Sequence, residues 1–411
     1  MAKRRRVAIM LDLNWPYKRH HGVFAGTQQY ARQCGRWECI LDAYVEQSLE
    51  GGRSRPAYDG IIARVTPRLA QAARRASVPL VNVWVSSPVT DVPLVAPDLE
   101  AVGRMAARHL MARGFRQFGF LGFIRQRGVK AQRTAFEATL AEAGLSCSSL
   151  LVPVGYTERP ANWQVFRARM DELIESWTPP IGVSVSYDLL CRYLACACRR
   201  RGVQVPRDAA LLGTHNEPLI CAHPEPSLSS IELGYERVGY RAAELLDKMM
   251  DGAPEPGKPV LLEPVALLPR RSSDALAVDD QMVAAALRFI SEHSHERIRV
   301  SDVVESLHVT RRTLERRFRA VLGRSIAEEI GRLRVERAKR RLTDSKTPIK
   351  RLAVEAGFGD GPQMCAVFKR IEGVTPSVYR RNHRRAAYTG QQRGRRAPGR
   401  RTSGTTSTAR C

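Results

Sequence analysis

The sequence predicts a chain of two unlike parts, a two-lobed α/β region over residues 5–272 and an all-α region over residues 283–386. In the first part, short apolar segments alternate with amphipathic segments, the pattern of a parallel sheet covered by helices on both faces. In the second part the short apolar segments vanish, and only helix and turn patterns remain. A length of 411 residues also exceeds one ordinary domain and allows two or three.

Composition and charge restrict the function. The formal net charge is +25, and residues 279–411 hold 30 Lys/Arg against 14 Asp/Glu, so the basic excess gathers at the C-terminal end. Such an excess predicts binding to a polyanion, with a merely solvated basic surface as the alternative. No apolar run approaches the roughly 20 residues of a membrane helix, and no signal peptide or membrane partner is expected. Nine cysteines without a regular spacing argue against a disulfide scaffold and favour the cytoplasm.

The α/β region contains strand and helix patterns that are too numerous for one small sheet, so we expect two similar lobes. Strands are predicted at 6–14, 59–65, 78–85, 93–98, 117–123, 181–186 and 209–216. Helices are predicted at 22–35, 99–114, 131–144, 187–202 and 235–252. Ligands of parallel sheets bind beyond the carboxyl ends of the strands. This rule indicates the loops at 14–19, 123–133, 186–188 and 213–217.

Two segments flank the all-α region. Residues 273–282 break the α/β pattern and are predicted to be a linker. Residues 387–411 are rich in Gly, Ser, Thr and Arg, lack core-forming residues and are predicted to be disordered.

A short helix after Thr310 carries five arginines within nine residues. At about 100° per residue, Leu314, Phe318 and Val321 fall on one side, while Arg312, Arg316 and Arg319 fall on the other. Thr310 is a plausible N-cap. The pattern predicts a helix that docks on a small core and turns its arginines toward an acidic partner.

The all-α region repeats this arrangement once. A short helix at 300–307 precedes the arginine helix, and a second pair consists of 349–356, a turn at Gly357 and a helix with the apolar stripe Met364, Phe368 and Ile371. Asp360 and Gln363 resemble a capping box. A connector helix of about 18 residues, ~27 Å long, joins the pairs. Two helix-turn-helix units so joined suit successive major-groove entries about 34 Å apart.

The segment "AVEAGFGDGPQMCAVFKRIEGVTPSVYRR" carries Gly357-Phe358, Phe368-Lys369, Gly373, Thr375-Pro376 and Tyr379-Arg380, and it resembles the signature of AraC-type DNA-binding domains. The resemblance implies duplex DNA as a partner. It places base-reading positions at Arg312 and Arg316, with Arg311 beside them, and in the second unit at Gly361, Pro362, Gln363, Cys365 and Ala366. Only Gln363 among the latter has a side chain well suited to base edges. Contacts to phosphate are expected from Arg317, Arg319, Lys369 and Arg370.

The order of segments over residues 5–270, such as "DLEAVGRMAARHLMARGFRQFGFLG" and "PSLSSIELGYERVGYRAAELL", resembles the sensor domain of LacI/GalR-type repressors, which is similar to periplasmic binding proteins. The resemblance implies a two-lobed sensor that binds a small sugar, xylose or a related pentose. It implies sugar contacts from Arg133, from Asp188 and from His215, which replaces the family's Asp. Further candidates for the pocket are Trp15, Tyr17 and Asn216, each with exposure to water as the simpler interpretation.

No metal site, cofactor or catalytic constellation is predicted. Cys191, Cys196 and Cys198 do not converge on one ion, and the neighbours His20 and His21 diverge. We therefore predict a homodimeric DNA-binding regulator, an activator that would contact RNA polymerase. Two alternatives remain open: an α/β enzyme acting on sugars or nucleosides with an accessory basic domain, and a nucleoid-type binder without a ligand.

Overall fold

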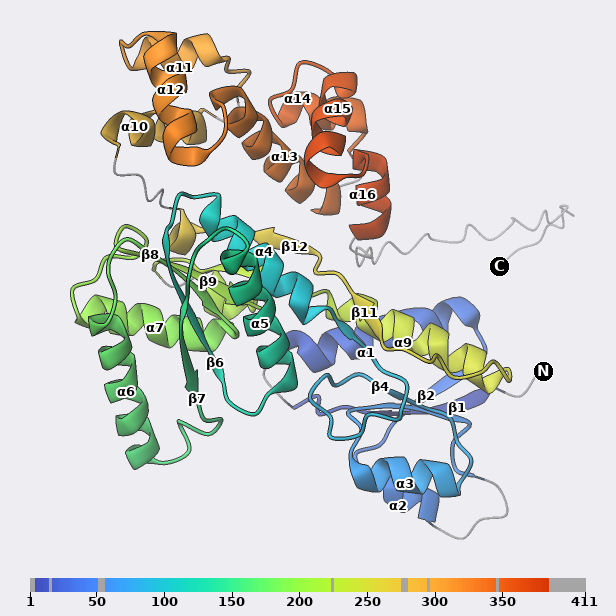
Figure 1. Ribbon diagram of the computed structural model, residues 1–411. Coiled ribbons are helices and arrows are strands. Elements are labelled where there is room, and N and C mark those ends of the chain that lie inside the picture. The colour runs from blue at the N-terminus through green and yellow to red at the C-terminus, as the bar shows by residue number, and fades with distance from the viewer. Residues whose placement is uncertain are drawn as a thin grey trace, which may run out of the picture.

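The two-lobed α/β region and the all-α region are both present in the computed structural model (Figure 1). The structure describes residues 4–14, 17–50, 56–222, 225–274, 280–293, 296–344 and 347–383. The prediction for 387–411 lies outside these described residues.

The N-terminal lobe is built on a parallel sheet with the strand order β2-β1-β3-β4. Its strands are β1 (Arg5–Met10), β2 (Trp37–Leu41), β3 (Gly60–Ala63) and β4 (Leu80–Asn82). A parallel pair, β5 (Val95–Pro97) and β11 (Val260–Leu262), lies next to β4 through an isolated bridge between Asn82 and Leu94. One face carries the closely packed helices α1 (Lys18–Cys34) and α9 (Tyr235–Met250), and the other carries α2 (Val45–Glu50) and α3 (Pro67–Arg75).

The C-terminal lobe is built on a six-stranded sheet with the order β12-β10-β9-β8-β6-β7, parallel except for β12 against β10. Its strands are β6 (Gln117–Phe123), β7 (Ser148–Val152), β8 (Ile181–Val185), β9 (Ala209–Thr214), β10 (Ser229–Glu232) and β12 (Ala266–Leu268). Its helices are α4 (Leu99–Met111), α5 (Arg127–Ala141), α6 (Pro160–Glu175), α7 (Asp188–Arg200) and the short α8 (Pro218–Cys221). Strand β8 is buried along its whole length, as expected for a parallel strand with helices on both sides.

The chain crosses between the lobes three times, at 97–99, at 232–235 and at 262–266. Gly234, in the second crossover, has a φ of +74°, a conformation in which glycine avoids steric strain. A Cβ atom at Gly234 would lie 2.5 Å from Val265 Cγ2, so the second and third crossovers are in contact. These three segments form the hinge of the cleft.

The α/β region ends in a 3₁₀ turn, Arg271–Ser273, which is hydrogen-bonded to the C-terminal lobe. Ser272 Oγ donates to Leu211 O at 2.7 Å, and Ser273 Oγ bonds Ser229 Oγ at 2.7 Å. Both serines are fully buried. The first residue of the predicted linker, Ser273, therefore belongs to the sensor fold, and the last two residues of that linker, 281 and 282, already belong to the next helix, α10.

The all-α region contains seven helices within the described residues. They are α10 (Gln281–Glu292), α11 (Val300–Ser306), α12 (Arg311–Leu322), α13 (Ile326–Asp344), α14 (Ile349–Glu355), α15 (Gly361–Glu372) and α16 (Pro376–His383). Helix α13 is the predicted connector, and it contributes its first half to one small core and its second half to another. The predicted turn at Gly357 is confirmed, with a φ of +84°. Ile371 was predicted in the buried stripe of α15, which is wrong, because its side chain is 38% exposed.

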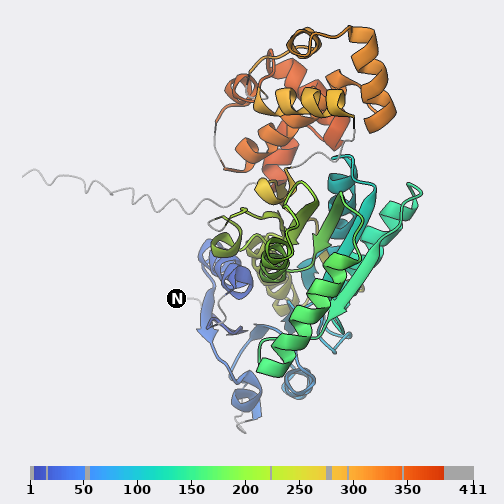
Figure 2. The same ribbon diagram turned by 90° about the vertical axis from the view of Figure 1, so that its left-hand side faces the viewer.

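The all-α region rests on the C-terminal lobe and on the third crossover (Figures 1 and 2). Arg324, just before α13, donates to the carbonyl oxygen of Ala112 at the end of α4. The Tyr379 hydroxyl of α16 donates to Val265 O at 3.4 Å. The hinge of the cleft is thus in direct contact with the helical region.

Candidate functional sites

Helix α12 packs with one face on a small hydrophobic core, and both of its ends are capped. Thr310 Oγ1 accepts a hydrogen bond from Thr313 N at 3.3 Å, which confirms the predicted N-cap, and Gly323 ends the helix in the left-handed conformation. Leu314 and Phe318 are fully buried in the first helical core. Because this core fixes the rotation of the helix, its opposite face must point to solvent.

That opposite face is basic. The side chains of Arg311, Arg312, Arg316 and Arg319 are exposed, and among the described residues none of them pairs with a carboxylate. Arg317 differs from its neighbours, because its Nη1 donates to Asp280 Oδ2 at 3.2 Å. The predicted phosphate contact of Arg317 therefore competes with an ion pair inside the domain, whereas Arg312 and Arg316 are available to a partner.

The corresponding helix of the second unit, α15, has a different surface. Asp360 accepts from Gln363 N at 2.7 Å, and Gln363 Oε1 accepts from Gly359 N at 2.7 Å, so the predicted capping interaction uses both side chains. The carboxamide NH₂ of Gln363 remains a donor toward solvent. Lys369 and Arg370 are exposed at the other end of the helix. This surface offers one side chain for base edges and two cations for phosphate.

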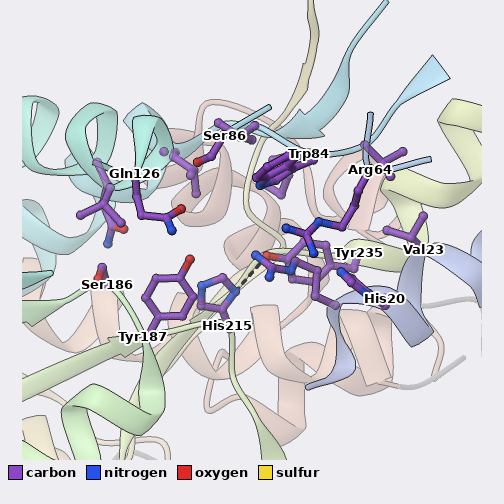
Figure 3. A pocket seen from close by; sticks show the side chains of 18 of the residues that line it. His20, Val23, Arg64, Trp84, Ser86, Gln126, Ser186, Tyr187, His215 and Tyr235 are labelled. Atoms are coloured by element: carbon purple, nitrogen blue, oxygen red, sulfur yellow. Dashed lines mark hydrogen bonds between the residues drawn. The ribbon is translucent and has the colours of Figure 1, made fainter. Parts of the chain in front are cut away.

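A second site lies in the cleft between the two lobes (Figure 3). It is lined by apolar and polar residues from both lobes and the hinge: Leu11, Arg19, His20, Val23, Arg64, Val83, Trp84, Val85, Ser86, Pro97, Leu99, Gln126, Gly128, Val129, Gln132, Ser186, Tyr187, His215 and Tyr235. The unfilled space measures about 50 Å³, enough for a few water molecules. Ligand pockets commonly offer about 300–1,000 Å³. A ligand therefore needs the lobes or the lining side chains to move.

His215 lies at the centre of the cleft in an ordered set of hydrogen bonds. The Tyr235 hydroxyl and His215 Nδ1 are 2.9 Å apart (Figure 3), and the imidazole also bonds the backbone of Ser186. The ring of Tyr187 stacks on the imidazole at 4.6 Å. Burial lowers the pKa of His215 well below its usual value, and the nearby cations Arg19 and Lys18 act in the same direction. A neutral imidazole with Nε2–H toward Ser186 must accept the Tyr235 proton at Nδ1.

Two guanidinium groups enter the cleft from the N-terminal lobe. Arg19, in the first turn of α1, hydrogen-bonds the hydroxyls of Tyr187 and Tyr235. Arg64 follows strand β3, and its Cζ lies 4.5 Å from the centre of the Trp84 ring, a cation–π contact. Both arginines are among the lining residues.

Several residues predicted to bind the ligand lie elsewhere. Arg133 is directed away from the lining and approaches Glu137 at 3.8 Å, whereas its neighbour Gln132 lines the cleft and donates to Thr214 Oγ1 at 3.0 Å. A shift of one residue on helix α5 turns the side chain by about 100°, which explains the difference. Trp15 lies outside the described residues.

Asp188, Asn216 and Tyr17 lie behind or beside the cleft rather than on its lining. Asp188 is buried and accepts from Ser230 Oγ at 2.6 Å and from Glu217 N at 2.8 Å, so it organises the strand ends from behind. Asn216 is likewise engaged, with Glu232 at 3.0 Å and Arg270 at 2.7 Å. Of the predicted ligand residues, His215 lines the cleft.

Sequence reasoning missed the loops after β3 and β4, which bring Arg64 and Trp84 into the cleft, and the hinge residue Tyr235. The rule that ligands lie at carboxyl strand ends applied equally to these two loops and could have found both residues. Ser186 and Gln126 do lie in loops that were predicted to face the ligand.

Two negative observations apply to the described part of the chain. It holds no group of three or more His, Cys, Asp or Glu side chains arranged to bind a metal ion. No helix in it is both long and apolar enough to span a membrane.

The chain matches two family models. Residues 107–273 match a periplasmic binding protein-like domain, and residues 303–382 match a helix-turn-helix domain. Together with the cleft and the arginine helix, these matches define a transcription regulator with a periplasmic-binding-protein-like sensor and an AraC-type DNA-binding domain. Its relatives and fold neighbours are regulators, so the alternative of an α/β enzyme is rejected.

The similarity to xylose regulators extends over nearly the whole chain. The xylose operon regulatory protein of Haemophilus influenzae is 27% identical over 388 residues, covering 92% of this chain and 98% of that protein. Its counterpart in Escherichia coli K12 is 26% identical, covering 92% of this chain and 97% of that protein. The solved structure of the xylose-binding transcription activator xylR covers 93% of this chain and 100% of its own, with 25% identity and a TM-score of 0.58.

Proposed function

We propose that this protein is an activator of transcription whose binding to DNA is controlled by a small sugar held between the lobes. Xylose and related pentoses are the first sugars to test, because the relatives that match the whole chain are xylose regulators. A homodimer would present two DNA-binding domains, and RNA polymerase would be the further partner of an activator. The cytoplasm is the corresponding compartment.

The observation that carries the DNA-binding half is the exposed basic face of α12. Arg312 and Arg316 are exposed on the face opposite the buried Leu314 and Phe318. A guanidinium there could bond guanine O6 and N7 together. Arg311 and Gln363 are proposed as further base contacts. Arg319, Lys369 and Arg370 are proposed as phosphate contacts, which add affinity without sequence choice.

The sensor half is supported by the polar lining of the cleft and by the contact between the hinge and α16. A sugar that closes the lobes would move the third crossover and with it the DNA-binding domain. In a dimer this movement would change the spacing of the two DNA-reading units.

The test is the affinity of the protein for DNA from the region upstream of its own gene and the neighbouring genes. Fluorescence anisotropy measures this affinity with and without pentoses. Arg316→Ala should weaken specific binding by roughly 10- to 100-fold and relax base choice at one position, because a bidentate guanine contact contributes about 1–3 kcal/mol. Arg317→Ala is the matched control on the same helix, and a smaller loss is expected because that arginine already pairs with Asp280. Equal losses for both variants would contradict base reading by Arg316. Binding that no sugar alters would contradict the sensor half.

A further inference from the structure

The charge of the cleft lining is one-sided. It includes the guanidinium groups of Arg19 and Arg64, and among the described residues that form it there is no carboxylate. The undescribed residues of the α/β region, 1–3, 15–16, 51–55 and 223–224, contain no Asp or Glu in the sequence. A sugar pocket that reads neutral hydroxyls usually combines such donors with carboxylate acceptors.

We infer that the effector of this cleft is an acidic sugar, one that carries a carboxylate or a phosphate group, rather than a neutral pentose. The inference rests on the proposed sugar-sensing function and narrows its ligand to one chemical class. A guanidinium fork bonds either anion through two parallel hydrogen bonds, so the two sources of negative charge share the same recognition chemistry.

The nearest carboxylates have other partners. Glu217 accepts from Lys18 N at 3.1 Å, and Glu232 pairs with the Lys18 ammonium and with Asn216 Nδ2. Asp12 is exposed and accepts from Asn14 N at 3.1 Å. Asp12 also interacts electrostatically with Arg64, and Glu217 with Arg19, from outside the lining. These acids balance cations and backbone donors around the cleft, but none of the three reaches its lining.

The backbone adds positive potential at one helix end. Helix α5 begins at Arg127 and has neither an acidic residue in its first turn nor a side-chain cap at its N-terminus, whereas the first N–H of α1 already donates to the Glu217 carboxylate. Gly128, in the first turn of α5, lines the cleft without a side chain of its own. The unpaired N–H groups of such a turn favour an anion.

A buried hydroxyl in the same cleft lacks a hydrogen-bond partner. Ser186 is 1% exposed, its Oγ has no partner in the described part of the molecule, and it lies on the lining beside Tyr187 (Figure 3). Leaving a buried hydroxyl unsatisfied costs free energy, which an oxygen of a bound ligand would recover. The orphan hydroxyl lies on the C-terminal lobe and the arginines lie on the N-terminal lobe, so one ligand would join both lobes.

The two histidines of the lining respond to the same potential. Burial, assisted by Arg19 and Arg64, lowers the pKa of His20 to about 4, although the backbone oxygen and the charge of Asp12 act in the opposite direction. The pKa of His215 is lowered by burial and then by Arg19. Both rings therefore remain neutral near pH 7, and the two guanidiniums are the cations that a ligand meets on the lining.

A neutral sugar offers the two guanidinium groups only hydroxyl oxygens, whereas a carboxylate or phosphate group offers them a charge-assisted partner with two parallel hydrogen bonds. One face of Trp84 is also covered by Arg64, so the aromatic surface that a pyranose would stack on is partly occupied. An anionic group would compete with the Trp84 ring for the Arg64 guanidinium.

The experiment is calorimetry on the full-length protein with matched pairs of probes. Xylose is compared with xylonate and a pentose phosphate, and glucose is compared with gluconate, glucuronate and a hexose phosphate. At least one acidic member should bind roughly tenfold or more tightly than its neutral parent, as expected for a charge-assisted pair. The carboxylate and phosphate arms decide which anion is preferred.

Substitutions of Arg64 test whether this arginine is responsible for the preference for acidic probes. Arg64→Gln should lower affinity for the acidic probe by roughly tenfold and should lower affinity for the neutral parent by clearly less. Arg64→Lys should restore part of the loss because it keeps the charge. Arg32→Gln removes an exposed arginine from the last turn of α1 and serves as the control for net charge.

Two results would overturn the inference. If the neutral sugars bind as tightly as the acids, or if Arg64→Gln weakens both classes equally, the acidic ligand is excluded while the sugar sensor stands. If none of the probes binds, the proposed sensor function fails together with the inference.

Discussion

At the scale of single residues, one substitution relative to the sugar-binding pattern changes the polarity of the cleft. His215 occupies the strand end at which the LacI-type pattern leads us to expect a carboxylate, and its φ of +98° turns the ring between Tyr187 and Tyr235. A neutral imidazole cannot balance Arg19 as a carboxylate would. The hydroxyls of Tyr187 and Tyr235 hydrogen-bond the Arg19 guanidinium and hold it at the cleft, where an anionic ligand is proposed to meet it.

The carboxylate behind the cleft, Asp188, gives a prediction about pH. Burial raises the pKa of Asp188 to about 7, although hydrogen bonds from Ser230 and from Glu217 N act in the opposite direction. An unfolded aspartate titrates near pH 4, so between about pH 4 and 7 only the unfolded chain loses this proton. The stability contributed by this group is complete below about pH 4 and is lost as the pH rises through 7.

Asp188→Asn should remove this dependence. Wild-type protein is expected to lose on the order of 4 kcal/mol between about pH 4 and 8 through this group, and the variant should show a flatter profile. Urea unfolding of both proteins near pH 5 and pH 8 measures the difference. Asp91→Asn, at an exposed carboxylate paired with Arg74, is the control and should keep the wild-type slope. Parallel profiles for wild type and Asp188→Asn would contradict the assignment.

At the scale of elements, the packing of α1 against α9 positions the cation of the cleft. A Cβ atom at Gly239 would lie 1.9 Å from Val23 O, and one at Gly26 would lie 1.9 Å from Glu236 O, so the two backbones are nearly in contact. Asp247 ties the same helices to β2, accepting from Tyr30 Oη at 2.7 Å and from Trp37 Nε1 at 2.9 Å. Arg19 begins one helix and Tyr235 begins the other, and their hydrogen bond depends on this close approach.

Gly239→Ala should therefore affect both stability and the ligand site. The added methyl group must push α9 away from α1, at a cost of about 1–3 kcal/mol or more, and the displacement should weaken binding of the effector. Thermal unfolding and calorimetry measure the two effects. Gly257→Ala is the control, because a Cβ atom there meets nothing within 4 Å. Equal melting temperatures for the two variants would show that the helices can separate without cost.

The secondary-structure elements also show which parts of the fold the sequence patterns could predict. Strands β8 and β9 were predicted because both faces are covered, so their residues form continuous apolar runs. The edge strands β2 and β7, the buried but serine-containing β10 and the three-residue β11 and β12 carry no such run and were missed. The loops after β8 and β9 were expected at the cleft, but Arg64 and Trp84 were not, since each follows a short strand without a polar motif. The arginine face of α12 was predicted in full, because a helix fixes its faces by local geometry alone.

At the scale of the whole molecule, the DNA-binding domain and the sensor face each other across a polar cavity. Like charges face each other across a cavity of about 1040 Å³, with Arg104, Arg108 and Arg270 on the sensor side and Arg332, Arg337, Lys339 and Arg341 on the other. Acidic side chains in the same lining, Glu263, Asp274 and Glu372, offset part of this repulsion. An interface of this kind can be shifted by a small change in geometry, which a ligand-controlled regulator requires.

The contact between α16 and the hinge is the direct route for such a change. Val265 lies in the third crossover, touches the second crossover at Gly234 and accepts from the Tyr379 hydroxyl at 3.4 Å. Closure of the lobes changes the crossovers first, because they are the segments shared by both lobes. A displacement of Val265 would therefore be passed to α16 and, through the shared core of Phe368 and Tyr379, to helix α15, which is proposed to contact DNA.

Tyr379→Phe should reduce this coupling without abolishing DNA binding. The ring stays in its core, whereas the lost hydrogen bond contributes about 0.5–1.5 kcal/mol, so the ligand-dependent change in DNA affinity should shrink by roughly 2- to 10-fold. Affinity without ligand should stay within about twofold of wild type. Anisotropy with upstream DNA, with and without the tightest-binding sugar probe, measures both quantities. Tyr240→Phe removes a hydroxyl that bonds Gln33 inside the N-terminal lobe, and it should leave the response unchanged. A full ligand response in Tyr379→Phe would contradict this route, and the contact between Arg324 and the Ala112 carbonyl would be the next one to test.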